Sequence, residues 1–333
     1  MRVPVALAAV ILVSALFSPA LGSSESLERV IEKAHDHYFN LEYDESIAAY
    51  REAISLDPDN PRFYNQLASA TLYKELHRLG LLETSAFKND ELLERSRPEV
   101  DRDVRQSVID ALKRSRDLAE KQLKAEPHDP TARFALAVGY GLQANYQFML
   151  DKAYFTALRS GQTAKKQANR LLKDNPEFVD GLLIVGAQEY VIGSLPWAAR
   201  ALVALGGVSG SKTKGEQMVV RVSRGGRWAR YEARVLLALL YRRERRPLEA
   251  ASQLEALIEA FPRNYVLRLE LGSMYVDADE KQRALETLRT ARRMTRRNEH
   301  RYGRMPERLR EALDRKIAEL ERTSAIAPAA AVD

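Results

Sequence analysis

The sequence contains no cysteine, and histidine occurs only five times in 333 residues. Without cysteine the chain forms no disulfide, and it offers no thiolate to bind a metal ion or attack a substrate. A lipid-modified cysteine of the bacterial lipoprotein type is excluded for the same reason. His35 and His37 stand two apart on an expected helix, so they face different directions and cannot share a metal ion.

Two further absences concern catalytic motifs. No H-E-x-x-H zinc motif and no G-x-S-x-G nucleophile elbow occur anywhere in the chain. Acidic residues are plentiful, but 46 carboxylates in a helical protein always provide pairs, so their number singles out no catalytic pair. The sequence therefore predicts a non-catalytic protein that holds no metal ion and no cofactor.

Long apolar runs are absent after the first 22 residues. The N-terminus has a positive start at Arg2, an apolar run over Val5–Phe17, and the small residues Ala20 and Gly22 before a candidate cleavage point. This layout is typical of a secretory signal peptide over residues 1–22. The run is too short for a typical membrane span, although an uncleaved N-terminal anchor remains the alternative.

The compartment follows from this leader. No later stretch approaches the roughly 18 apolar residues that a membrane span needs. We therefore expect an exported protein that is not transmembrane after signal removal. The periplasm is the simplest location, and secretion is the alternative.

Alternating strand patterns are also missing, and apolar residues instead recur at helical spacing. Residues 43–58 and 247–262 are two similar amphipathic segments, each stopped by proline, and shorter versions end at Pro127 and Pro176. Each stop is followed by another helical pattern. The sequence therefore predicts an all-α protein built from internally similar helix pairs.

These pairs resemble the tetratricopeptide repeat, a 34-residue helix-turn-helix unit. In residues 265–298, Leu271 and Tyr275 fall on the large positions of the first helix, and Ala284 and Ala291 fall on the small positions of the second. Small residues let two helix backbones approach closely. Large residues fill the groove between neighbouring pairs.

Other copies are less regular. Residues 231–264 and 27–60 carry most of the pattern, and degenerate helix pairs are expected near 105–146 and 160–192. The resemblance implies an α-solenoid of antiparallel helix pairs, with about five irregular repeats and inserts. We expect this domain over residues 23–321, with inserts near 76–104 and 192–226 and a disordered tail over 322–333.

The second insert contains GGVSGSKTKG, which approaches the phosphate-binding pattern G-x-x-x-x-G-K-[ST]. Ser211 stands where the pattern needs glycine before Lys212, and a side chain there crowds the phosphate. The preceding residues 195–205 read as a short helix stopped by Gly206 and Gly207, not as a strand. The stretch therefore predicts a glycine-rich turn between helices.

The resemblance implies that first helices line a concave groove that holds a partner peptide or helix. Residues at groove positions are Tyr38, Phe39, Tyr73, Phe134, Leu183, Tyr190, Leu236, Leu239, Arg242 and Arg243. The two arginines could hold a carboxylate. An insert that folds back over the groove would instead make the apolar members ordinary core residues.

A basic stretch runs over residues 212–246, and a second basic cluster spans 292–304. The function we predict is an exported, non-catalytic scaffold that binds a protein or peptide in its groove, in cell-envelope assembly or maintenance. One alternative is an enzyme with its site in the 192–226 insert. Another is a peripheral binder of an anionic envelope surface that uses residues 212–246. Nucleic acid is not an expected partner of an exported protein.

Overall fold

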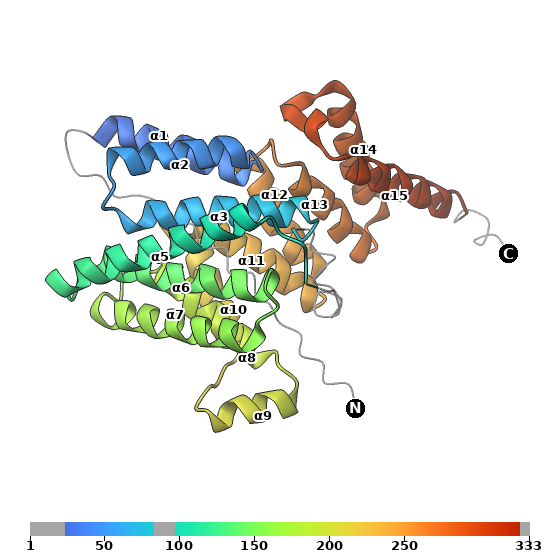
Figure 1. Ribbon diagram of the computed structural model, residues 1–333. Helices are drawn as coiled ribbons and strands as arrows, with labels where there is room; N and C mark the ends of the chain where they lie inside the picture. Colours follow the sequence, from blue (N-terminus) through green and yellow to red (C-terminus); the bar gives the residue numbers. More distant parts are fainter. Residues whose placement is uncertain (1–23, 83–96, 327–333) are drawn as a thin grey trace. The chain divides into compact units, whose positions relative to one another are not determined.

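The computed structural model describes residues 24–82 and 97–326 of the protein. Every regular element in these two ranges is a helix (Figure 1). The predicted signal peptide and residues 83–96 of the first predicted insert lie outside the described residues.

The helices have the following bounds. The first seven are α1 (Ser24–Phe39), α2 (Tyr43–Leu56), α3 (Pro61–Arg78), α5 (Arg102–Ala125), α6 (Pro130–Met149), α7 (Tyr154–Asp174) and α8 (Gly181–Gly193). The next four are α9 (Trp197–Leu205), α10 (Lys212–Gly225), α11 (Arg230–Arg243) and α12 (Pro247–Ala260). The last are α13 (Tyr265–Asp277), α14 (Lys281–Arg297), the 3-10 helix η2 (Glu299–Arg304) and α15 (Glu307–Ile326).

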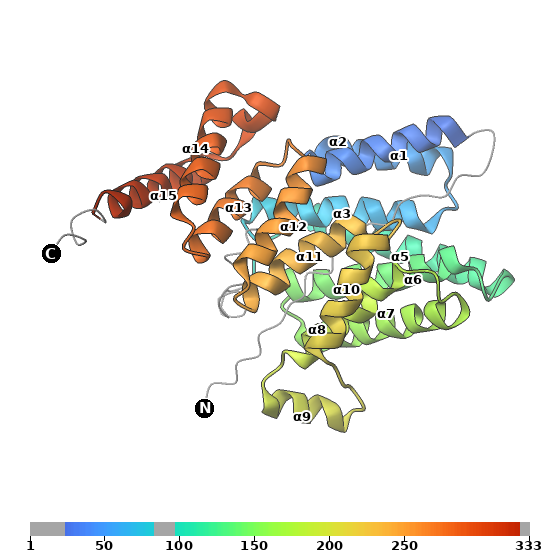
Figure 2. The same cartoon turned by 180° about the vertical axis from the view of Figure 1, so that it is seen from behind.

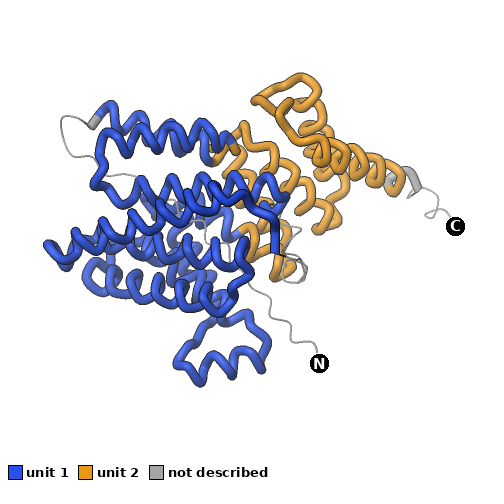
Figure 3. Tube along the Cα trace, in the orientation of Figure 1, with its two compact units in different colours: residues 1–38, 42–237 blue, residues 39–41, 238–333 orange. Residues whose placement is uncertain are grey.

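The chain divides into two compact units (Figure 3). Unit 1 takes the chain up to residue 38 and residues 42–237, and unit 2 takes residues 39–41 and 238–333. Helix α11 therefore begins in unit 1 and ends in unit 2.

Local sequence signals explain where several helices begin. The Asp129 side chain accepts hydrogen bonds from the backbone N–H groups of Thr131 (2.8 Å) and Ala132 (3.2 Å), and Pro130 occupies the first turn of α6. Asn60 caps α3 in the same way. A capping side chain satisfies helix N–H groups that have no partner within the helix, and proline has no N–H to satisfy.

The helices pack in successive antiparallel pairs, which confirms the all-α solenoid prediction (Figures 1 and 2). Small residues lie where the helices of a pair cross, as the repeat pattern requires. Ser46 occupies one such position in place of the usual alanine, and its buried hydroxyl donates a 2.9 Å hydrogen bond to the Ala34 carbonyl of α1. The exchange therefore buries no unsatisfied hydroxyl.

The structure narrows the second insert. A Cβ on Gly215 would lie only 2.5 Å from the Gly186 carbonyl oxygen, so α10 crosses α8 at close backbone contact. Helix α10 is therefore the second helix of the α8 pair, and the inserted segment is residues 194–211 rather than 192–226.

The C-terminal ends of α9 and α15 define two further boundaries. Helix α9 ends at Leu205 with Gly206 as its C-cap, as predicted, and Gly207 takes a φ of 74°, which glycine adopts without strain. Helix α15 continues to Ile326, so residues 322–326 of the predicted disordered tail are helical. The remainder of that tail lies outside the described residues.

Candidate interaction surfaces

Six of the ten predicted groove residues belong to unit 1, and the structure buries all of them. They are Tyr38, Tyr73, Phe134, Leu183, Tyr190 and Leu236. A side chain that is already removed from water gains little from a partner, because the hydrophobic effect scales with the apolar area newly buried.

The packing of these residues is specific. The Tyr38 and Tyr73 rings meet edge to face with centroids 5.9 Å apart, and the Tyr38 hydroxyl lies 3.0 Å from the Ser69 hydroxyl. Phe134 packs against Phe178 and Trp228, with centroids 5.2 and 5.6 Å away. These are interior contacts of unit 1. Partner binding by these side chains stays a prediction and requires an opening of this interior.

Phe39 belongs to unit 2 and is also buried. Its ring stacks on Phe261 at 4.5 Å, and its carbonyl accepts a 2.7 Å hydrogen bond from the Asn264 side chain. This residue therefore has a structural role in the interior of unit 2.

The last three predicted residues lie at the end of α11 in unit 2 and differ from the others. Leu239 and Arg243 are half-buried, so part of each side chain contacts solvent. Arg242 is committed to α13, because its guanidinium pairs with Glu270 at 2.9 Å and with Asp277 at 3.1 Å. Arg243 makes no ion pair with any residue in the described ranges.

Helix α13 contributes half-buried residues at the equivalent repeat positions. Leu269, Ser273 and Val276 lie one 34-residue repeat after α11 positions, and the Arg242 ion pairs hold α13 beside α11. We call Leu239, Arg243, Leu269, Ser273 and Val276 the α11–α13 face. The sequence analysis named two of these five. Applying the same register to the next repeat would have found Ser273 and Val276, which correspond to Leu239 and Arg242, but not Leu269.

The loop before α10 is not a phosphate site. The Ser211 side chain caps α10 at the Lys214 N–H (3.4 Å), and the Ser211 N–H donates to the Glu189 carboxylate at 3.0 Å. Lys165 pairs with the same carboxylate at 2.6 Å. The Ser211 N–H that a bound phosphate would need is therefore already occupied by Glu189, and no strand precedes the loop within the described chain.

The same region was the proposed location of an enzyme site. Trp197 is 79% exposed on α9, so it lines no closed pocket. The buried carboxylate of Asp180 accepts hydrogen bonds from the backbone N–H groups of Arg227, Trp228 and Ala229 at 3.2, 2.8 and 2.7 Å. That carboxylate therefore holds the chain entering α11 and has a structural role.

Asp36, His37 and Glu42 form one group in the described ranges with metal-ligating atoms within 4.8 Å of one another. The His37 Nδ1 is hydrogen-bonded to the Glu42 carboxylate, and Glu42 is buried. The imidazole thus partners a carboxylate that would be costly to bury alone.

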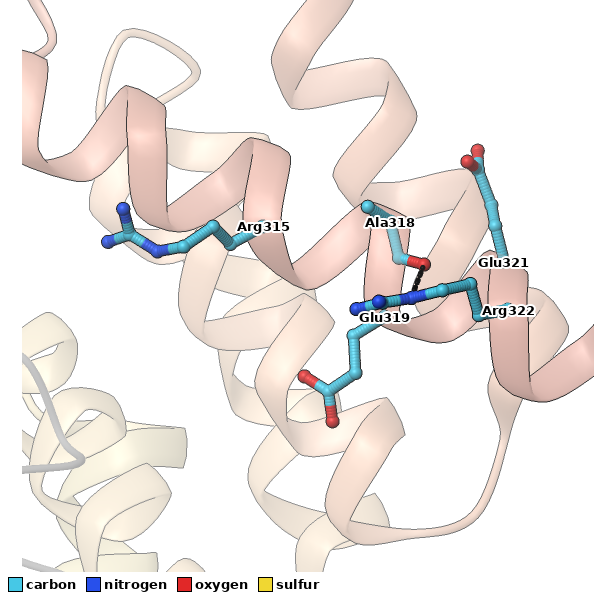
Figure 4. Close-up of a pocket in the computed structure, with 5 residues that line it drawn as sticks. All are labelled: Arg315, Ala318, Glu319, Glu321 and Arg322. Carbon is cyan, nitrogen blue, oxygen red and sulfur yellow. Dashed lines mark hydrogen bonds between the residues drawn. The ribbon is translucent and has the colours of Figure 1, made fainter.

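A shallow, open hollow of about 760 Å³ lies along α15 (Figure 4). It is lined by Arg315, Ala318, Glu319, Glu321 and Arg322, all from this single helix. The charged groups are occupied elsewhere: Glu321 pairs with Arg289 at 2.8 Å, and the Arg322 Nε donates to the Ala318 carbonyl at 3.3 Å. The hollow therefore presents no converging set of free polar groups.

The two basic clusters are partly neutralised. In the C-terminal cluster, Arg292 lies 3.7 Å from Asp314 and Arg297 lies 3.6 Å from Glu299. In the 212–246 stretch, Arg242 and Arg246 pair with acidic residues, whereas the basic side chains on the exposed side of α10 do not pair with described residues. These α10 residues are Lys214, Arg221 and Arg224.

Comparison with known protein families identifies the same repeat. A family model described as TPR repeat matches residues 42–72, and a second described as Tetratricopeptide repeat matches residues 235–299. The comparison with curated proteins found no match.

Three solved structures are similar in part. A thermophilic TPR protein of Thermus thermophilus is 16% identical, with 75% of this chain and 99% of that chain covered and a TM-score of 0.41. A tetratricopeptide repeat protein of Parabacteroides merdae is 17% identical, with coverages of 90% and 100% and a TM-score of 0.34. Yeast Tom70 is 11% identical, with coverages of 92% and 97% and a TM-score of 0.28.

The second segment covers α12 to α14 and most of α11, where the best copies in the sequence lie, and the first covers α2 and most of α3. Repeats of this kind mediate protein–protein interaction and are typically non-catalytic scaffolds. The small residues at the helix crossings and the large residues between pairs also follow the tetratricopeptide pattern. The chain therefore belongs to the tetratricopeptide repeat superfamily.

Proposed function

We propose that the protein is an exported, non-catalytic scaffold that holds a segment of another protein on the α11–α13 face, in cell-envelope assembly or maintenance. The observation that carries this proposal is the α11–α13 face itself. It combines half-buried apolar side chains with a guanidinium that has no ion-pair partner in the described chain.

The chemistry of this face defines the segment it fits. Leu239, Leu269 and Val276 offer apolar surface, and a partner gains about 25 cal/mol for each Å² of apolar area that it buries there. Arg243 provides a planar fork of donors suited to a carboxylate. The expected partner segment therefore places an aspartate, a glutamate or a C-terminal carboxylate next to apolar side chains.

Arg242 supports this role without contacting the partner. Its ion pairs with Glu270 and Asp277 fix α11 against α13, and its side chain is only 8% exposed. A pre-ordered face loses less conformational entropy when a partner binds, so a small interface gains affinity.

Export rests on the composition of residues 1–22, with a positive start, an apolar run and small residues before Gly22. N-terminal sequencing of the protein recovered from the periplasm tests it. We expect a mature chain that starts at Ser23. A chain that retains Met1 and fractionates with the cytoplasm would contradict export without affecting the proposed face.

Site-specific photocrosslinking in the native host tests the binding face. A p-benzoylphenylalanine placed at Val276 is expected to crosslink a partner protein. The same probe at Arg296, an exposed residue on α14, should not give that adduct.

The matched variants are L239E/R243E on the face and R296E as the charge control. Reversing Arg243 removes the carboxylate contact, so the Val276 adduct should fall by about tenfold in L239E/R243E. It should be unchanged in R296E. An adduct that survives L239E/R243E would contradict this location.

A further inference from the structure

The large apolar side chains most exposed to solvent gather at one end of unit 1. Within the described ranges, seven large hydrophobic residues are exposed, and the four most exposed are Leu205 (87%), Phe155 (85%), Trp197 (79%) and Leu202 (68%). The other three are between 40% and 52% exposed. We call these four residues the α9 patch.

The helix packing brings the four together. The side chain of Gln188 on α8 lies against Gly161 on α7, and the two helices are antiparallel. The start of α7, with Phe155, therefore lies at the same end of this pair as Gly193. Helix α9 follows α8 at that end and stands apart from the other helices of unit 1 (Figures 1 and 2).

Helix α9 turns its apolar side to solvent. Trp197, Ala201 and Leu205 are spaced four residues apart and share one face, which Leu202 extends. All four are exposed, whereas Ala199 and Val203 on the other side are half-buried, and no residue of α9 is buried. A soluble helix usually has the opposite arrangement, so this face suits an apolar partner.

Positive charge surrounds the α9 patch. Arg159, Arg200 and Lys214 are exposed at this end, and residues 190–215 contain no aspartate or glutamate. Of the acidic residues nearest in sequence, Glu189 pairs with Lys165, Asp151 pairs with Arg97 and Arg105, and Glu216 follows this stretch on α10. The local field therefore favours an anionic surface.

Length restricts how α9 could meet a bilayer. No single described helix is long and apolar enough to cross a membrane, although α8 and α9 pass together as a pair bent by 120°. Helix α8 is buried inside unit 1, which leaves α9 as the available part. Nine residues span about 13 Å, far less than the roughly 30 Å hydrocarbon core, so α9 is suited to lie flat in the interface.

We propose that the α9 patch docks unit 1 on the surface of an anionic phospholipid bilayer. Leu202, Leu205 and Phe155 enter the boundary between headgroups and acyl chains, where an amphipathic helix sinks about 5–10 Å. Trp197 lies at headgroup level, which its amphipathic ring favours. Arg159, Arg200 and Lys214 contact lipid phosphates.

A lipid surface fits this patch better than a protein. A stable protein interface buries about 800 Å² on each side, and α9 presents a face of only about 13 by 10 Å. Its outward face carries the indole N–H of Trp197 as its one polar side-chain group, and the charged groups around it are all cationic, which suits an anionic bilayer surface. This docking is independent of any partner on the α11–α13 face.

Flotation of the full-length mature protein with lipid vesicles tests the proposal. The probes are vesicles of phosphatidylcholine alone and of phosphatidylcholine with phosphatidylglycerol, at low and high salt. The apolar variant is L202E/L205E. Its matched control is L56E/L248E, which makes the same change at two exposed leucines outside the α9 patch.

The wild-type protein is expected to float with anionic vesicles, more strongly at low salt. L202E/L205E should lower the partition coefficient by at least about tenfold, because two leucines no longer leave water. R200Q/K214Q should lower it by about 25-fold on anionic vesicles at low salt, because each of the two phosphate contacts by Lys or Arg supplies about a fivefold gain. L56E/L248E should bind like wild type.

Tryptophan quenching gives a second readout. Trp197 is 79% exposed and Trp228 is 6% exposed, so brominated lipids should quench Trp197 alone. Three results would each overturn the proposal. They are no flotation of the wild type, an equal loss of vesicle binding in L202E/L205E and L56E/L248E, or unquenched Trp197 fluorescence in the bound protein. A wild-type dimer that L202E/L205E dissociates, without vesicle binding, would overturn it in favour of a second copy of this chain.

Discussion

Unit 1 and unit 2 contain the same repeat, but residues at its groove positions differ in solvent exposure between the two units. Tyr73 lies on α3 and Arg243 lies on α11, and both were predicted to line the groove. Tyr73 is 2% exposed in unit 1, whereas Arg243 is half-buried in unit 2. Helices α5, α6 and α7 have 24, 20 and 21 residues, and α12, α13 and α14 have 14, 13 and 17.

The difference shows that the repeat motif fixes how two helices pair but does not fix what reaches solvent. In unit 1 aromatic residues at groove positions pack on one another and become core. In unit 2, Phe39 and Arg242 are also committed to contacts within the unit, but Leu239 and Arg243 stay half-buried. Binding by this superfamily member is therefore expected where the inner face carries residues that do not pack on themselves.

The largest expected effect comes from removing a groove-position residue of unit 1. Phe134→Ala should lower the free energy of unfolding by about 3–5 kcal/mol, because it leaves a cavity at a fully buried ring. Urea denaturation followed by far-UV circular dichroism measures it. Val276→Ala, at a half-buried position of unit 2, should cost less than about 1.5 kcal/mol. Similar losses of unfolding free energy in the two variants would contradict the difference in burial between unit 1 and unit 2.

A smaller effect is expected at the ion pair that orders unit 2. Arg242→Ala leaves Glu270, whose side chain is 8% exposed, without its partner, and should cost about 2–4 kcal/mol. Arg289→Ala removes an exposed pair with Glu321 and should cost less than about 1 kcal/mol. The same denaturation experiment compares them. An equal cost for both arginines would show that α11 and α13 do not depend on this contact.

The next prediction concerns pH and unit 1. His35 lies with its ring 6.0 Å from that of Tyr231, and burial lowers the pKa of His35 from 6.5 to about 4, opposed by the charge of Asp36. Between these values the unfolded chain binds more protons than the folded chain, so stability should fall as pH drops from about 6.5 to about 4.

The loss should reach about 2 kcal/mol over that window. His35→Gln should remove this part of the pH dependence when unfolding free energies are compared at pH values across it. His128, exposed on the surface, provides the control through His128→Gln, which should leave the dependence in place. An unchanged pH profile in His35→Gln would contradict a neutral imidazole at this half-buried position.

Sequence reasoning reached the helix pairs because their signals are local. The proline stops, the small residues at Ala284 and Ala291, and the glycine stop after Leu205 all lie within one or two turns of the feature they determine. The interior of unit 1 has no such signal. Tyr38 meets Ser69 across 31 residues of sequence, and Asp180 holds the chain 47 to 49 residues later, so only packing reveals these contacts.

The same reason explains what was missed at the surface. The apolar face of residues 197–205 is visible in the sequence, but an apolar helix face usually points inward. Nothing local indicates that this helix stands apart from α7, α8 and α10. Conversely, part of the α11–α13 face is recoverable, because Ser273 and Val276 lie one 34-residue period after the named positions Leu239 and Arg242.

The absence of cysteine allows a direct test of the difference between the two units. Single variants Leu183→Cys in unit 1 and Val276→Cys in unit 2 each carry one thiol, whose alkylation rate by iodoacetamide reports access under native conditions. Because Leu183 is buried, alkylation of Val276→Cys should be at least about 100-fold faster than alkylation of Leu183→Cys. Equal rates would show that the inner face of unit 1 is open, and would return Tyr38, Tyr73 and Phe134 to the list of partner-binding residues.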